Sequence, residues 1–248
     1  MAVSNGSGWQ TRLFAATEAI ALVLGLFLFA SLLVIAVSEA VVNAGFASAD
    51  GVEIRIVTTL TQFGAFAIGV GWYVHVTGRW ELLAAYVPSN RQLALVAVGT
   101  VVLLGSQFAI TAALGAFGIS TGTNQAIIEG REQPWYLLAM VPLSILVVGP
   151  IEELLFRGVL QGRLRDSWGP WPAIVIATIV FGVVHLPAIA GTPGQQYATV
   201  FTVALLGLLL GYLYERTGNL VVPAAVHGLN NAAIFGLQYL IAIGILGV

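Results

Sequence analysis

The chain of 248 residues contains no cysteine and no lysine, and only 8% of its residues are charged. Without cysteine the protein can have no disulfide framework, no thiolate metal site, no cysteine nucleophile and no acylated anchor. A soluble domain usually carries about 25% charged residues, so this composition cannot cover a surface that faces water. The net charge of −2 and the lack of a basic run also argue against nucleic acid as a partner.

Apolar residues dominate instead, because hydrophobic side chains make up 58% of the chain and its mean hydropathy is +0.95. A hydrocarbon layer about 30 Å thick needs roughly 20 apolar residues per helix. We therefore predict an all-α fold, a polytopic transmembrane helix bundle of about seven to eight spanning helices that forms one integral-membrane domain over residues 1–248. The apolar runs fall at 18–45, 56–77, 92–117, 135–160, 171–190, 197–215 and 219–247.

Three features of these runs refine the prediction. The run at 18–45 is too long for a removable signal peptide and lacks a small-residue cleavage site. The connection at 117–134 is the longest polar one, and we expect an exposed loop or a short interfacial helix there. The run at 219–247 contains Asn230 and Asn231, so it fits either one long helix or two short ones.

The arginines indicate how the bundle is oriented. Cytoplasmic loops are enriched in Lys and Arg, and a cytoplasmic N-terminus places most of the loop arginines on the cytoplasmic side. We therefore expect a multi-pass protein of the cell membrane with its N-terminus in the cytoplasm. The cytoplasmic group is then Arg12, Arg79, Arg91, Arg163, Arg165 and Arg216, and the external group is Arg55 and Arg131.

Several polar side chains interrupt the apolar runs. Charged groups at membrane depth cost about 2.5 kcal/mol or more on insertion scales, so each one needs a reason. Glu18, Glu39 and His75 lie near the ends of runs, from which their side chains can reach the interface. The others lie deep in the C-terminal half, and they are Glu152, Glu153, Arg157, His185, His227 and Asn231.

These deep residues form three phrases with a spacing of four. Residues four apart share a helix face, so Glu153 and Arg157 are placed to form an ion pair. Adjacent residues on a helix point about 100° apart, so Glu152 faces elsewhere and stays free for other work. The phrases are Glu152-Glu153-x-x-x-Arg157, Phe181-x-x-x-His185 and His227-x-x-x-Asn231.

The three phrases are also expected to meet at a similar depth. Gly and Pro residues at 166–172 must reverse the chain, and Glu152 and His185 each lie about 14 residues, or about 21 Å, from that turn. His227 and Asn231 lie about 12 to 18 Å beyond the turn at 217–219. With the N-terminus inside, we expect the site to open to the cytoplasm, with the loop at 163–165 and its two arginines beside the mouth.

Such a set of residues suits amide hydrolysis without a covalent intermediate. A buried carboxylate can act as a general base on water, and a neutral His can hold that water or a metal ion. An Asn amide and a second His can donate to a developing oxyanion. No Ser sits in a nucleophile elbow and no H-E-x-x-H signature is present, but Glu152, His185 and His227 could together hold a divalent metal such as zinc.

In their order and on apolar helices, the three phrases resemble the CPBP family of intramembrane endopeptidases, the Abi-like group of CAAX proteases and bacteriocin-processing proteins. The family pattern is E-E-x-x-x-R, then F-x-x-x-H, then H-x-x-x-N or D, and it covers roughly residues 135–247, the expected catalytic core. The resemblance implies an eight-helix bundle in which Glu152 and His185 activate water. It implies that His227 and Asn231 stabilise the oxyanion, while Glu153, Arg157 and Phe181 support the site.

The predicted function is therefore that of a glutamate- or metal-dependent intramembrane endopeptidase. Its partners would be membrane lipid and a membrane-associated peptide or a lipidated, CAAX-type protein. Two alternatives stay open at this point. The buried Glu and His residues could form the relay of a proton-coupled transporter, or the protein could be a scaffold without catalytic activity. The small-residue stripe Ala204, Gly207 and Gly211 would permit helix contacts in a scaffold, although such stripes usually serve internal packing.

Overall fold

The computed structural model describes residues 8–247, and almost all of them are helical. The N-terminal part comprises α1 (Gly8–Asn43), α2 (Val52–Thr77), the short 3₁₀ helix η1 (Trp80–Leu83) and α3 (Asn90–Ala116). The connection that follows contains β1 (Thr123–Asn124) and α4 (Gln125–Glu132), so the short helix expected between residues 117 and 134 is present.

The C-terminal part begins with one continuous helix, Pro134–Trp168. Two π-helical stretches divide this helix, and its consecutive pieces are α5 (Pro134–Leu143), η2 (Ser144–Val148), α6 (Gly149–Glu153), η3 (Leu154–Gln161) and α7 (Gly162–Trp168). The remaining elements are α8 (Pro170–Val184), η4 (Leu186–Ala188), β2 (Ile189–Ala190), α9 (Pro193–Thr217) and α10 (Val221–Ala242).

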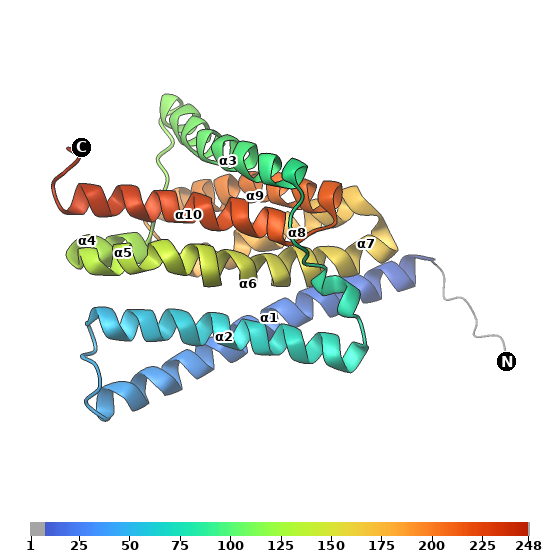
Figure 1. The fold of residues 1–248 in the computed structure, drawn as a ribbon, viewed down its shortest axis with the longest axis horizontal. Coiled ribbons are helices and arrows are strands. Elements are labelled where there is room, and N and C mark those ends of the chain that lie inside the picture. Colours follow the sequence, from blue (N-terminus) through green and yellow to red (C-terminus); the bar gives the residue numbers. More distant parts are fainter. Residues whose placement is uncertain (1–7, 248) are drawn as a thin grey trace.

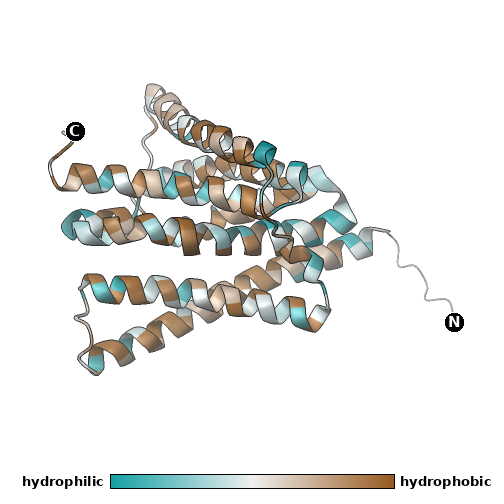
Figure 2. Ribbon diagram, in the orientation of Figure 1, coloured by the Kyte–Doolittle hydropathy of each residue, from teal (hydrophilic) through white to brown (hydrophobic). Residues whose placement is uncertain are grey.

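The predicted fold class is confirmed, because the described chain is an all-α bundle with six helices long and apolar enough to cross a membrane. They are α1, α2, α3, the helix Pro134–Trp168, the segment Pro170–Ala188 that begins with α8, and α9. The 22-residue α10 (Val221–Ala242) is one long helix rather than two short ones, and it carries His227, Asn230 and Asn231. Figure 2 shows apolar residues along the lengths of the helices.

Figure 1 shows α1 and α2 as an antiparallel hairpin that diverges from the rest of the bundle at one end. Helix α10 lies between other helices of the bundle and packs against α3, α5, α6 and α9. Helices α8 and α9 pack together closely, since a Cβ atom at Gly182 would lie 2.9 Å from the Val200 carbonyl and 3.0 Å from Ala204 Cβ. The stripe of Ala204, Gly207 and Gly211 therefore serves internal packing, with Gly207 against Phe181.

The turn between α7 and α8 lies where the sequence predicts it. Gly169 has a φ of 79°, which favours glycine, and Pro170 begins α8 without the need of a backbone N–H. The other end of α8 differs from the predicted run of 171–190, because the helix stops at Val184. Pro187 disfavours further helix, and β2 then pairs antiparallel with β1, with Thr123 opposite Ala190.

Candidate active site

Two π-helical stretches flank the acidic pair on the long helix. Five α-helical residues, Gly149–Glu153, separate η2 from η3, and Glu152 and Glu153 end this short piece. Segments of π-helix are rare and frequently occur at functional sites, because the wider turn redirects side chains. No direct signal in the sequence predicts these π-helical stretches, although Pro142 and Pro150 both interrupt the regular α-helical bonding nearby.

Glycines bring α10 into backbone contact with this segment. A Cβ atom at Gly149 would lie 2.8 Å from the amide nitrogen of Gly228, and a Cβ atom at Gly228 would lie 2.7 Å from the carbonyl oxygen of Ser144. No side chain fits at such distances, so both positions require glycine. The close approach sets His227, the neighbour of Gly228, beside the two carboxylates.

The charged groups form a continuous chain across two helices. Glu153 and Arg157 are fully buried, and Arg157 Nε lies 3.0 Å from Glu153 Oε2, so the predicted ion pair is present. His227 Nδ1 lies 2.9 Å from Glu153 Oε1, and its Nε2 lies 3.5 Å from Glu152 Oε2. With a cationic His227, the two acidic and two basic groups balance.

The second phrase, Phe181-x-x-x-His185, approaches these charged groups from α8. The Phe181 ring packs edge-on against His185 and His227, at 4.7 and 5.7 Å between ring centroids, and the Arg157 guanidinium carbon lies 4.9 Å from its centre. His185 Nδ1 lies 2.6 Å from the Phe181 carbonyl oxygen. A carbonyl oxygen only accepts, so Nδ1 must carry the proton, and a neutral His185 keeps Nε2 as an acceptor.

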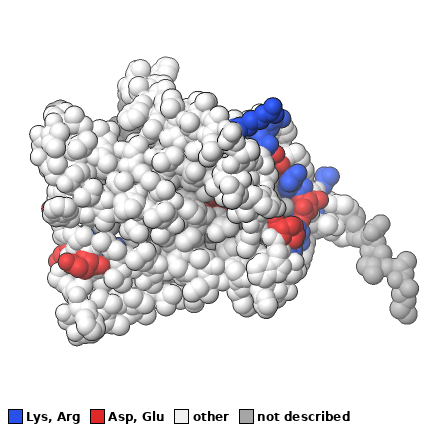
Figure 3. Space-filling view, in the orientation of Figure 1, with Lys and Arg blue, Asp and Glu red and all other residues white. Residues whose placement is uncertain are grey.

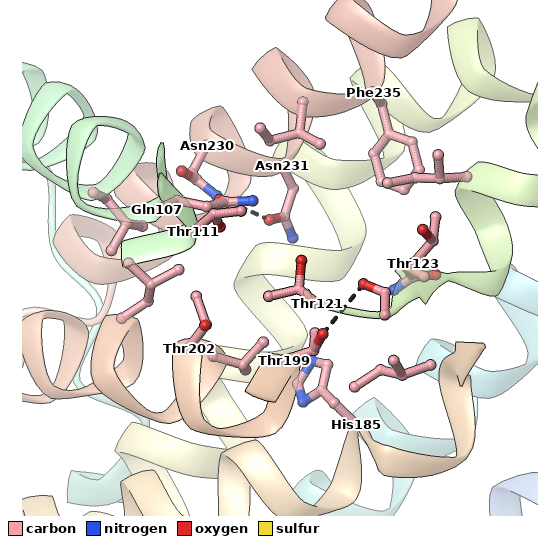
Figure 4. A pocket seen from close by; sticks show the side chains of 18 of the residues that line it. Gln107, Thr111, Thr121, Thr123, His185, Thr199, Thr202, Asn230, Asn231 and Phe235 are labelled. Atoms are coloured by element: carbon pink, nitrogen blue, oxygen red, sulfur yellow. Dashed lines mark hydrogen bonds between the residues drawn. The ribbon is translucent and has the colours of Figure 1, made fainter. Parts of the chain in front are cut away.

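Asn231 faces a cavity, and a polar neighbour orients its amide. Asn230 Nδ2 donates to Asn231 Oδ1 at 3.3 Å and lies 3.4 Å from Gln107 Oε1 on α3. Figure 4 shows the Asn231 side chain pointing into the cavity. Because its oxygen accepts from Asn230, its Nδ2 group is left to donate there. Sequence reasoning missed Asn230 and Gln107, although a lone Gln inside an apolar run was a usable signal.

Two cavities meet at these residues. The larger, of about 350 Å³, lies against α3, α9 and α10 and is lined by His185, His227 and Asn231. The smaller, of about 220 Å³, lies towards α1, α2 and α5 and is lined by Glu152. His185 and Asn231 border both cavities, as do Asn124 and Phe235. The structure thus brings Glu152, His185, His227 and Asn231 to one junction, with Glu153, Arg157 and Phe181 packed behind it.

The mouth of the site differs from the prediction. Both cavities are bordered by β1, α4 and the segment after α8, and the larger one also by Arg131 and Gln238. These elements lie at the end of the bundle opposite the α7–α8 turn. The predicted mouth beside Arg163 and Arg165 is therefore wrong. Those side chains instead pair with Glu18 of α1 and Glu215 of α9.

The predicted metal ligands do not assemble into a metal site. Within residues 8–247, no three His, Asp or Glu side chains are grouped as ligands of one ion. The physical reason is that both nitrogens of His227 face carboxylates, while His185 approaches from α8 with Nδ1 held by a carbonyl. The arrangement of Glu152, His185 and His227 therefore does not fit zinc, and we assign no step to a metal.

Comparison with known proteins supports the family resemblance for this region. The family model for type II CAAX prenyl endopeptidase Rce1-like proteins matches residues 134–233. A Bacillus subtilis (strain 168) protein named "Putative membrane peptidase YdiL" is 30% identical over 128 residues, which cover 49% of this chain and 46% of that protein. "Uncharacterized protein YpbD" of the same organism is 31% identical over 117 residues, covering 47% of this chain and 52% of that protein.

The chain thus spans about half the length of these curated relatives. No solved structure matches it. The segment matched by the family model begins at the long helix and contains the three phrases from Glu152 to Asn231. Over this segment the chain is similar to the type II CAAX prenyl endopeptidases, which supports its resemblance to the CPBP family of intramembrane proteases.

Proposed function

We propose that the protein is an intramembrane endopeptidase in which Glu152 and His185 activate a water molecule for attack on a peptide bond. The observation that carries this proposal is the junction of two cavities, where phrases from three helices meet around Glu152. A structural ion pair needs only Glu153 and Arg157, so packing alone does not account for Glu152, His185 and Asn231 around open space.

The reaction can be written with the residues at the junction. Glu152 accepts a proton from water while Nε2 of His185 holds the water in place, and the water oxygen bonds to the carbonyl carbon. Asn231 Nδ2 donates to the oxyanion that develops. The proton on Glu152 then passes to the leaving nitrogen as the C–N bond breaks, which yields a carboxylic acid and an amine. Transfer of the second water proton from the acid to the amine gives a carboxylate and an ammonium group.

The structure changes the role that we expect for His227. The family resemblance implies that it stabilises the oxyanion, but both of its ring nitrogens face carboxylate oxygens. We infer that His227 orients Glu152 and connects it to the buried pair of Glu153 and Arg157. Asn231 is then the donor that faces the reacting carbonyl.

The substrate that we propose is a membrane-associated peptide, including lipidated peptides of the CAAX type. The two cavities lie among membrane-spanning helices, and a peptide bond can enter such a space only if polar groups satisfy its N–H and C=O. The larger cavity supplies such groups, since Thr121, Thr123, Thr199, Thr202 and Gln107 line it (Figure 4). The smaller cavity has more aromatic side chains in its wall, among them Phe27, Phe63 and Tyr136.

The direct test is cleavage of a fluorescence-quenched, prenylated peptide by the purified protein in detergent. We expect product masses that correspond to hydrolysis of one peptide bond, and in H₂¹⁸O the new carboxylate should carry the label. Absence of cleavage across a panel of lipidated and unlipidated peptides would contradict the proposal. Proton movement in liposomes that depends on Glu152 would instead favour a transporter. If the protein shows neither activity, the remaining alternative is a scaffold without catalytic activity.

A further inference from the structure

Residues 155–162 of the long helix, which lead from Glu152 towards the α7–α8 turn, are enclosed on every side. Leu155, Phe156, Val159 and Leu160 are each 0% exposed, and Arg157 and Gln161 are buried as well. A helix buried around its whole circumference leaves no groove along which water or a peptide could pass. The stretch touches α1, α2, α8 and α9, so each of these neighbours closes one side.

The helix η1 closes the remaining side. Its Leu82 is 4% exposed and packs against two glycines of the long helix. A Cβ atom at Gly158 would lie 2.6 Å from the Leu82 carbonyl oxygen, and one at Gly162 would lie 2.7 Å from Leu82 Cδ2. Next to it, buried Asn219 accepts from the Tyr86 amide and donates to the Tyr86 carbonyl, both at 3.0 Å. The segment between α2 and α3, which contains η1, therefore inserts between the helices and closes this end of the bundle.

Ion pairs tie the surface of the same end together. Arg163 Nη2 lies 2.8 Å from Glu18 Oε2, which joins α7 to α1, and the Arg165–Glu215 pair joins α7 to α9. Arg79 pairs with Asp166. Partial burial alone would lower the pKa of Arg79, but its hydrogen bonds to Asp166 and Glu81 raise that pKa above its ordinary value. Figure 3 shows charged side chains gathered at this end.

This closed end also carries most of the arginines. Arg12 lies in the first turns of α1, where its Nε donates to the Ser167 carbonyl, and Arg91 and Arg216 lie at the matching ends of α3 and α9. With Arg79, Arg163 and Arg165 they make six, whereas only Arg55 and Arg131 lie at the end with the cavities. An excess of arginine marks the cytoplasmic side of a membrane protein. The closed end is therefore the cytoplasmic one.

We propose that the site takes its substrate from the extracytoplasmic side of the membrane. This inference rests on the proposed function, and it follows because the cavities border β1, α4 and Gln238 while the arginine-rich end is packed shut. The substrate is then a peptide segment exposed at the outer leaflet, such as part of an exported or secreted polypeptide. A lipidated protein held at the cytoplasmic leaflet does not reach Glu152.

Cysteine labelling tests this inference without any need for enzymatic activity, because the natural chain has no cysteine. Thr121 points into the larger cavity, Gln125 is exposed at the start of α4, and Ser167 lies at the α7–α8 turn. Single variants Thr121→Cys, Gln125→Cys and Ser167→Cys are treated with an impermeant maleimide in intact cells and after permeabilisation. The neighbouring Gly122 is unsuitable for a cysteine substitution, because a Cβ atom there would lie 2.5 Å from the Ala190 carbonyl oxygen.

We expect Thr121→Cys and Gln125→Cys to react in intact cells, and Ser167→Cys to react only after permeabilisation. The opposite pattern would show that the arginine-rich end is external, and it would overturn the proposal. Labelling of Thr121→Cys from the same side as Ser167→Cys would also overturn it, because the cavity would then open through the end that we describe as closed. A folded variant is confirmed by size-exclusion chromatography in detergent.

The cleavage assay adds a second readout that separates this inference from the proposed function. The quenched prenylated peptide, made impermeant by a sulfonated fluorophore, is added to sealed vesicles of either orientation. We expect right-side-out vesicles to cleave it as fast as permeabilised ones, and inside-out vesicles to need permeabilisation. Cleavage restricted to sealed inside-out vesicles would overturn the sidedness alone. No cleavage even after permeabilisation would count against the proposed function, while the labelling result would still decide the side.

Discussion

The two halves of the helix Pro134–Trp168 have opposite surroundings. Before Glu152 the helix borders a cavity, and the Glu152 side chain is 14% exposed. Residues 155–162 of the helix are enclosed, and the side chains of Glu153 and Arg157 are 0% exposed. The environments of the two adjacent glutamates therefore give them different roles. Glu152 can meet water and substrate, whereas Glu153 is confined to its buried contacts with Arg157 and His227.

The largest effect should come from the open half, at His185. Its removal takes away the group that holds the water, and acid–base groups of this kind contribute about 10² to 10⁴-fold to the rate. We expect His185→Ala to lose activity on that scale with little change in thermal unfolding. His75→Ala, near the end of α2, is the matched control and should keep normal turnover. Equal rates for the two variants would remove His185 from the reaction.

Substitutions in the closed half of the helix should lower the stability of the protein rather than act directly on catalysis. Arg157→Met or Glu153→Gln leaves one buried group without its partner, which costs about 3 to 5 kcal/mol, whereas the double variant should be milder. Thermal unfolding in detergent gives the three values, and additive losses would argue against a coupled pair. Arg163→Met is the control, because its pair with Glu18 is only partly buried and should cost less to break than the fully buried pair.

Asn231 should affect the rate rather than substrate binding. Loss of one oxyanion donor lowers kcat by about 10² to 10³-fold, because the bond strengthens only as charge develops. Asn231→Ala should therefore lower kcat with KM nearly unchanged. Asn230→Ala should have a smaller effect, since Asn230 acts by orienting the Asn231 amide. A rise in KM at constant kcat would instead make Asn231 a binding residue.

The contact between α10 and the long helix gives a smaller effect. Gly228→Ala places a methyl group against the Ser144 carbonyl, and overpacking of this kind costs about 1 to 3 kcal/mol. Gly236→Ala on the same helix is the control, since its Cβ atom would meet only Val141 Cγ2 at 3.9 Å. Unfolding midpoints and activity are compared for both. Equal behaviour would show that the close approach at Gly228 is not needed.

Chelation should have the smallest effect. Because Glu152, His185 and His227 are not grouped as ligands of one ion, we expect dialysis against a chelator to leave turnover unchanged. The assay compares dialysed and untreated protein, with elemental analysis of bound metal in both. Loss of activity that returns on addition of zinc would contradict this expectation and restore the metal set predicted from the sequence.

The sequence alone predicts much of the fold and the identity of the site, because both depend on local signals. Apolar runs predict the spanning helices, and a spacing of four predicts the pair of Glu153 and Arg157. The side of access could not be predicted, because it depends on how η1 and α4 pack against distant helices. The same holds for Gly149 and Gly228, whose need for glycine arises only where two backbones meet.

The end of α8 shows the same limit. The apolar run continues to residue 190, but Pro187 and pairing with β1 end the helix at Val184, and this places His185 at a helix terminus beside the cavity. The depth estimate for His185 remains sound, because the helix is regular from Pro170 to that point. The predicted position of the cavity mouth is wrong. The equal distances of Glu152 and His185 from the turn do not indicate at which end of the bundle the helices pack closely.

The most direct test compares Glu152→Gln with Glu153→Gln in the same purified preparation, by peptide cleavage and by thermal unfolding. We expect Glu152→Gln to lower kcat about 10² to 10⁴-fold with an unchanged midpoint, because it removes the base and keeps the shape. We expect Glu153→Gln to lower the midpoint, because it leaves Arg157 buried without its counter-charge. Near-normal turnover by a folded Glu152→Gln variant would contradict the central claim that Glu152 activates the water.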